Sequence, residues 1–232
     1  MKKYQLEIVL DENPWNPRED DNGTIMVCGH RSYNLGDKHN YKQGDFNSWD
    51  EMKEQIIKDY KVLMIKPLYL YDHSGITIST SSFGCNFDSG QVGWVFVDET
   101  KFKKLCGEGT YTNEEIEQWI DSEVKTYDQY ITGDVWGYQV YEVVTCDKGH
   151  EHKELVDSCF GYYGEEEAKA EGESLMEHYE LEVGELKYYI YFEYDLRFYG
   201  GLFIFRHRGC RSALYVSWQI RITYVKFITQ KT

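Results

Sequence analysis

The chain has 232 residues, 41% of them hydrophobic and 16% aromatic, which is enough apolar surface for a folded core and excludes disorder throughout. Forty acidic residues against 25 basic ones give a formal net charge of −15, which disfavours direct binding of nucleic acid. The sequence has no apolar run of membrane-spanning length and no export signal, so we expect a cytoplasmic protein whose six scattered cysteines are reduced.

The first half of the chain is predicted to consist mainly of strands separated by polar loops. Alternating or continuous apolar patterns predict strands at 4–10, 24–28, 61–71, 76–80 and 92–97, with a break at Pro67. Residues 29–47 are polar and glycine-containing, which predicts a long loop. Residues 48–60 are predicted to be a helix, because Ser48 and Glu51 have the spacing of a capping box.

The second half adds two further helices and several strands. Thr112 and Glu115 form a second capping box at the start of a periodic helix at 112–131, and an acidic first turn opens another helix at 164–183. Strands are predicted at 134–144 and 155–163, paired through the turn CDKGHEH, and at 185–199 and 213–229. The strands outnumber the helices and do not alternate with them, which predicts an α+β fold: a mainly antiparallel sheet with about three helices packed on it.

The charge is distributed unevenly along the sequence. All forty acidic residues lie at or before Asp195, whereas residues 196–232 contain seven basic residues and no acidic one. We therefore divide the chain into an acidic α+β domain at 1–195 and a basic, β-rich segment at 196–232 that is expected to pack on the same domain. A strongly acidic body attracts basic surfaces of other proteins.

Common catalytic motifs are absent from the sequence. It contains no phosphate-binding GxxxxGK[ST] or GxGxxG pattern, no HExxH, no GxSxG and no EF-hand loop. Polar residues do gather in three loops, within CGHRSYNLGD, YDHSG and CNFDSGQ. If these loops meet, Cys85, Asp88 and either His73 or His30 could form a nucleophile, an orienting acid and a base.

The same loops allow two other interpretations. His30, His73, Asp72 and Asp88 could instead bind a divalent metal such as Zn, Mn or Fe. The third interpretation is structural, and it is the one that we favour. Asp and Ser beside glycine are common turn formers, and Gly75, Gly90 and Gly93 would then supply unusual backbone angles.

Five segments carry a resemblance to a known family. They are HRSYNLGD, PLYLYDHSGITIST, CNFDSGQVGWVFV, YDQYITGDVWGY and DSCFGYYG. Together they resemble small acidic proteins of bacteriophages and mobile elements that show HRRYNLGD, YDHSG, DSGQVG, TGDVYG and DSCWGFYG in this order. The match covers residues 1–165, and residues from about 185 onward fall outside the pattern. The family has no settled activity, so the resemblance implies a phage context more than a chemistry.

Acidic phage proteins without enzyme motifs resemble inhibitors of host defence, of the anti-CRISPR or anti-restriction type. The expected function is therefore non-enzymatic and needs no cofactor: the acidic body occupies the basic nucleic-acid channel of a host nuclease. The partner-binding residues are expected on two helix faces: Glu114, Glu115, Glu117, Asp121 and Glu123, and Glu165, Glu166, Glu167, Glu171, Glu173 and Glu177. The alternative is a hydrolase, with or without a metal, that uses His30, His73, Cys85 and Asp88.

Overall fold

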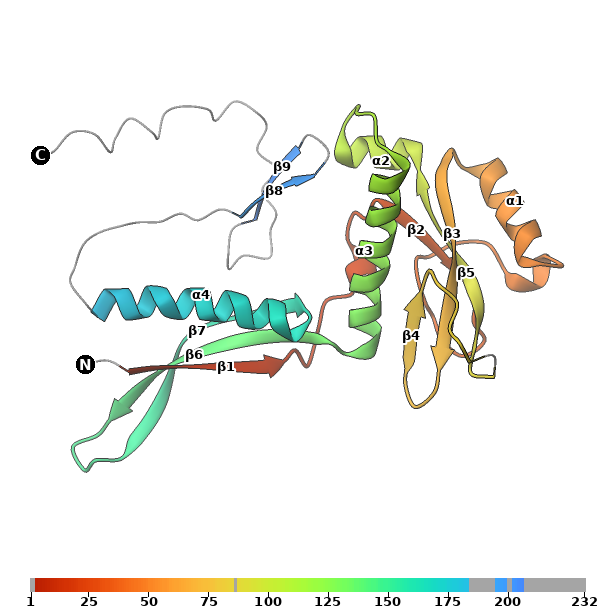
Figure 1. Ribbon diagram of the computed structural model, residues 1–232. Coiled ribbons are helices and arrows are strands. Elements are labelled where there is room, and N and C mark those ends of the chain that lie inside the picture. The colour runs from red at the N-terminus through yellow and green to blue at the C-terminus, as the bar shows by residue number, and fades with distance from the viewer. Residues whose placement is uncertain (1–2, 86, 184–194, 200–201, 207–232) are drawn as a thin grey trace, which may run out of the picture.

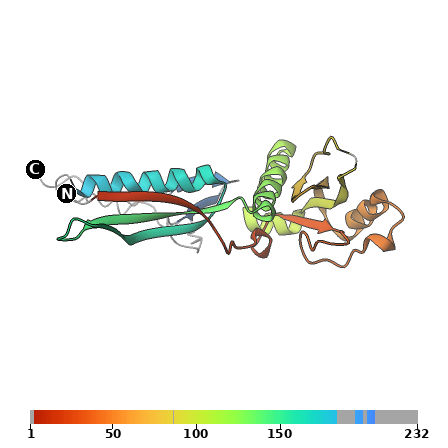
Figure 2. The ribbon, with the colours of Figure 1, turned by 90° about the horizontal axis from the view of Figure 1, so that it is seen from below.

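The described part of the chain folds into two main antiparallel sheets, a two-stranded hairpin and four α-helices, which confirms the predicted α+β class. The structure is a computed structural model that describes residues 3–85, 87–183, 195–199 and 202–206. Each sheet forms the centre of a separate lobe, and helix α3 (Asn113–Thr132) stands where the two lobes join (Figures 1 and 2). The predicted strands therefore belong to two sheets instead of one.

The first lobe is built on a four-stranded sheet that is covered on both faces. Its order is β2 (Thr24–Cys28), β5 (Ser89–Asp98), β3 (Val62–Asp72) and β4 (Ile76–Ser79). Val95 and Val97 of β5 belong to the hydrophobic cluster that contains residues of α2 (Glu99–Cys106) and α3. Trp94 and Phe96 instead belong to the cluster of α1 (Trp49–Asp59). Successive residues of a strand point to opposite faces, which is why VGWVFV is apolar at almost every position.

The second lobe is a three-stranded sheet with one covered face. Its order is β1 (Lys3–Leu10), β6 (Val135–Thr145) and β7 (Glu151–Tyr163), and α4 (Glu165–Val183) lies along it (Figures 1 and 2). The helix approaches closely at Gly172, where a Cβ would lie 2.7 Å from the Leu6 side chain. Polar contacts also cross the three strands, since Lys153 Nζ lies 2.6 Å from Glu7 Oε1 and over the ring of Tyr141. An antiparallel sheet tolerates such a polar face in water.

The helix ends follow the sequence signals. Ser48 accepts a hydrogen bond from the Glu51 amide, and Thr112 and Glu115 cap each other as predicted. Gly133 ends α3 in the left-handed conformation, at a φ of 77°. The predicted pairing of residues 134–144 with 155–163 is also confirmed, as β6 and β7.

Three elements differ from the sequence-based expectation. Helix α2 was not predicted, and its eight residues begin after Asp98, which accepts from the Lys101 amide. Pro67 does not break β3. Strand β4 pairs only with residues 69–72, so no strand among the described residues needs a hydrogen bond from position 67 on the side of β3 away from β5. The strand predicted at 185–199 is described only from Asp195, as β8 (Asp195–Tyr199), which pairs with β9 (Leu202–Arg206) in a hairpin across the boundary between the two predicted segments. The strand predicted at 213–229 lies outside the described residues.

Within the described part of the chain, no helix has the length and apolar character needed to cross a membrane.

Candidate functional site

The three polar loops meet at one end of the first sheet. The Asp72 amide donates to the Asp88 carbonyl oxygen at 2.7 Å, and His73 Nδ1 lies 3.3 Å from Asp88 Oδ2. Cys85 Sγ lies 3.6 Å from the same carboxylate oxygen. The loop after β2 reaches the same group through Tyr33. The hydrogen bond of its hydroxyl to the Asp72 side chain raises the pKa of Tyr33. The loops around Cys85, His73 and Asp88 therefore meet, with Asp88 at the point of contact.

His30 reaches this group only through a neighbour. Its Nδ1 accepts a hydrogen bond from the Ser32 amide at 3.2 Å, and its ring stacks on Tyr33 with the centroids 4.9 Å apart. These contacts lie within its own loop. His73 is thus the histidine that the structure brings to Asp88.

The geometry does not form a nucleophile–base pair. The sulfur of Cys85 contacts Asp88, and Asp88 also contacts His73, so the carboxylate stands where a catalytic base would have to be. The side chains of His73 and Asp88 are 64% and 38% exposed, so they lie on an open surface. The turn before β4 is held locally, since the His73 amide donates to the Gly75 carbonyl oxygen. These contacts match the structural interpretation.

The sequence suggested Asp72, His73 and Asp88 as possible ligands of a metal ion. Among the described residues, no group of three or more His, Cys, Asp and Glu side chains has an arrangement that could hold a metal ion. The one direct contact between anticipated side-chain ligands is the pair of His73 with Asp88.

Two substitutions test whether these side chains only shape the turns. We expect Cys85→Ser and His73→Ala each to change the free energy of unfolding by no more than about 0.5 kcal/mol, because both lie in surface turns. Urea unfolding followed by tryptophan fluorescence measures this. A loss of more than about 2 kcal/mol in either variant would contradict a local turn role.

Most anticipated acidic residues on α3 already have partners within the fold. Lys66 Nζ lies 3.0 Å from Glu117 and 2.8 Å from Asp121. Burial opposes the charge of Lys66, but the hydrogen bonds that it donates to these two carboxylates raise its pKa above the usual value. Glu115 is used in the capping box, whereas Glu114 is exposed. The α3 face is therefore only partly available to a partner.

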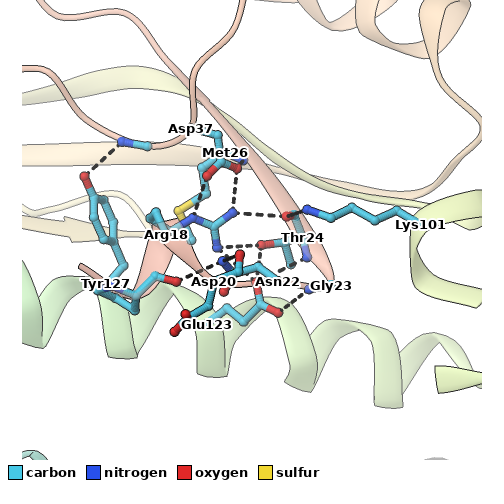
Figure 3. Close-up of polar contacts among 12 residues, drawn as sticks. Arg18, Asp20, Asn22, Gly23, Thr24, Met26, Asp37, Lys101, Glu123 and Tyr127 are labelled. Carbon is cyan, nitrogen blue, oxygen red and sulfur yellow. Dashed lines mark hydrogen bonds and ion pairs between the residues drawn. The ribbon is translucent and has the colours of Figure 1, made fainter. Parts of the chain in front are cut away.

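Glu123 belongs to the interior and not to the exposed face where it was anticipated. Its carboxylate accepts from the Gly23 amide at 2.7 Å and lies 3.0 Å from Arg18 (Figure 3). It also accepts from the Trp119 indole at 2.5 Å. The helical period predicted which face of α3 is apolar, but it did not predict that the buried Arg18 binds Glu123.

Arg18 is the centre of this network and was not identified from the sequence. Its guanidinium forms a two-bond fork with Asp37, at 3.0 and 2.6 Å, and also donates to the Thr24 carbonyl oxygen (Figure 3). Burial opposes its charge, yet Asp37 and Glu123 raise the pKa of Arg18 above its usual value. Asp37, the last residue of HRSYNLGD, therefore ties the loop after β2 to the core.

Helix α4 carries the least compensated negative charge. Glu165, Glu166, Glu167, Glu173 and Glu177 are exposed. Within the described residues, none of these five forms an ion pair, and Lys169 is the only basic residue between Glu165 and Glu177. Glu171 is half-buried and has interactions within the fold. Of the two anticipated acidic faces, the one on α4 has fewer ion pairs with the described residues than the one on α3.

One exposed aromatic side chain was not identified from the sequence. Phe87 lies in the polar loop beside Asp88, and its side chain is 99% exposed. A phenylalanine between polar turn residues has no periodic signal, so only a structure reveals that it points into solvent.

Comparisons with known proteins found no matching family model, no similar curated protein and no similar solved structure.

Proposed function

We propose that the chain is a non-enzymatic, phage-type inhibitor that binds a basic nucleic-acid channel of a host defence nuclease in the cytoplasm of an infected bacterium. The observation that carries the proposal is the row of exposed glutamates on α4, which form no ion pair with any residue that the structure describes. Charges that are already paired within the fold contribute little to attraction at a distance, whereas unpaired ones steer a basic partner towards the surface.

The charge density of α4 supports competition with nucleic acid. Five exposed glutamates lie between residues 165 and 177, a stretch about 18 Å long at a rise of about 1.5 Å per residue. This is roughly one exposed carboxylate per 3.6 Å, close to the one phosphate per about 3.4 Å of axis in each strand of duplex DNA. Packing against the second sheet holds the helix in one orientation, so the carboxylates would be presented without an ordering cost.

The experiment measures inhibition of a purified, guide-loaded CRISPR effector and of a restriction endonuclease over a range of salt concentrations. We expect the triple variant Glu166→Gln, Glu173→Gln and Glu177→Gln to weaken inhibition at least tenfold and to flatten its dependence on salt. Glu12→Gln, Glu19→Gln and Glu54→Gln is the matched control, because it removes the same charge from exposed positions elsewhere.

Three outcomes would count against the proposal. Equal loss in both triple variants would mean that net charge matters and α4 does not. No inhibition of either nuclease by the wild-type chain would remove the support for this partner class. Hydrolytic activity that is lost in a folded Asp88→Asn variant would favour the hydrolase alternative.

A further inference from the structure

A cleft lies between the C-terminal end of α1 and the loop that follows β2, away from the residues of the proposed function. Its volume is about 600 Å³, and it is lined by Lys38, His39, Asn40, Tyr41, Asp59 and Tyr60. This volume lies within the range of roughly 300–1,000 Å³ that is usual for small-molecule sites.

The walls of the cleft are held in place by the fold. Asp59 is oriented from two sides, by the Tyr41 hydroxyl at 2.8 Å and by the Gln55 amide nitrogen at 2.9 Å. The ring of Tyr60 lies 5.0 Å from that of Phe96. Side chains fixed in this way offer their binding groups at little cost in conformational entropy.

His39 is also fixed by a backbone contact. Its Nε2 lies 2.8 Å from the Cys28 carbonyl oxygen. Because a carbonyl oxygen only accepts, Nε2 carries the hydrogen, and the ring orientation on this side of the cleft is set.

Two lining side chains, by contrast, have no polar partner among the described residues. Within the described part of the chain, the side chains of Lys38 and Asn40 form no hydrogen bond or ion pair, and both residues are exposed. Lys38 is the one lysine or arginine of the lining, so it is the group that can meet an anion. Asn40 can donate and accept hydrogen bonds.

We propose that this cleft binds a nucleoside monophosphate whose base carries an amino group. The tyrosine rings provide faces on which a flat heterocycle can stack. The oriented carboxylate of Asp59 accepts hydrogen bonds and therefore matches an exocyclic amine, while Lys38 matches the phosphate. Neither charge alone would favour a nucleoside monophosphate over other ligands. The aromatic lining together with one cation and one oriented carboxylate matches the base, the phosphate and the amino group of such a ligand.

The arrangement makes a sharp prediction about selectivity. Cytosine carries an amine where uracil carries a carbonyl oxygen, and that oxygen would meet the Asp59 carboxylate unfavourably. CMP should therefore bind about tenfold more tightly than UMP, with a dissociation constant on the order of 1 mM for so open a site. Ribose 5-phosphate, which has no base, should bind still more weakly.

Titration of the full chain followed by ¹H–¹⁵N NMR tests the proposal, with CMP, UMP, cytidine, ribose 5-phosphate and inorganic phosphate as probes. Asp59→Asn should abolish or invert the preference for CMP over UMP, because the amide can donate to the uracil oxygen. Lys38→Ala should weaken CMP about tenfold and leave cytidine unchanged. Lys42→Ala removes an exposed lysine outside the lining and should have no effect.

Several results would overturn the proposal. One is the absence of saturable binding of CMP up to about 20 mM. Another is equal affinity for CMP and ribose 5-phosphate, and a third is an unchanged preference for CMP over UMP in a folded Asp59→Asn variant. Tyr60→Ala provides a second check, because it removes a stacking face without altering the charges. If it binds CMP like the wild type, the base does not lie in this cleft.

Discussion

Replacing Arg18 by methionine is expected to lower the free energy of unfolding by about 3–5 kcal/mol, because it leaves two carboxylates in the interior without their counter-charge. The Arg18 side chain is 2% exposed and lies between Asp37 and Glu123 (Figure 3). Methionine has a similar length, so the loss reports the charge and the hydrogen bonds more than a cavity. For a chain of this size the midpoint of thermal unfolding should fall by roughly 6–20 °C.

Urea unfolding of three variants separates the causes of this loss. Arg31→Met is the control, because Arg31 is exposed, and it should change the unfolding free energy by about 0.5 kcal/mol or less. Arg18→Met combined with Asp37→Asn and Glu123→Gln removes all three charges and should recover part of the stability. If Arg18→Met alone costs less than about 1 kcal/mol, the network does not hold the loop after β2 to the core.

The elements that the sequence predicted well are those whose signals are local. The capping box of α3 and the Ser48 cap of α1 satisfy amides within one turn, although the Glu51 carboxylate bonds to Asn47 and does not complete the box predicted at Ser48. The alternation in β1 and β6 reflects the face that α4 covers. Helix α2 also has local signals, an N-cap at Asp98 and two lysines in the last turn, but its eight residues show only a short apolar stripe and were not recognised as a helix. Its placement depends on packing of Phe102 in the core, which is a tertiary contact.

The candidate sites were predictable only in part, for the same reason. The convergence of Asp72, His73 and Asp88 could only be stated as a condition, because the sequence does not show that the end of β3 and the start of β5 are neighbours. Glu123 and Asp37 were read as surface or loop groups, and their common partner Arg18 lies 105 and 19 residues away in sequence. A single sequence contains no signal for an ion pair across such a separation. The division of the strands between two sheets was missed for the same reason.

The two glycines of the segment DSGQVG differ in the space that surrounds them, and only one of them is required by the packing of the strands. Gly90 and Gly93 were expected to supply unusual backbone angles, yet neither is among the residues with positive φ, unlike Gly75 at 155°. A Cβ at Gly93 would lie 1.9 Å from the Val27 carbonyl oxygen of the neighbouring strand, whereas a Cβ at Gly90 would have no heavy atom within 4 Å. Gly93 is therefore required for the close approach of β2 to β5.

Gly93→Ala is consequently expected to destabilise the fold by about 3 kcal/mol, the upper part of the range for overpacking, because the obstructing atom is backbone and cannot rotate away. Gly90→Ala in the same strand is the matched control and should change the unfolding free energy by less than about 0.5 kcal/mol. Chemical denaturation measures both. Amide hydrogen exchange should in addition be faster along β2 in Gly93→Ala only, since the added methyl group pushes that strand from β5. Equal stability of the two variants would mean that the strands can separate at this point without cost, and the tight β2–β5 contact would then not be a requirement of the fold.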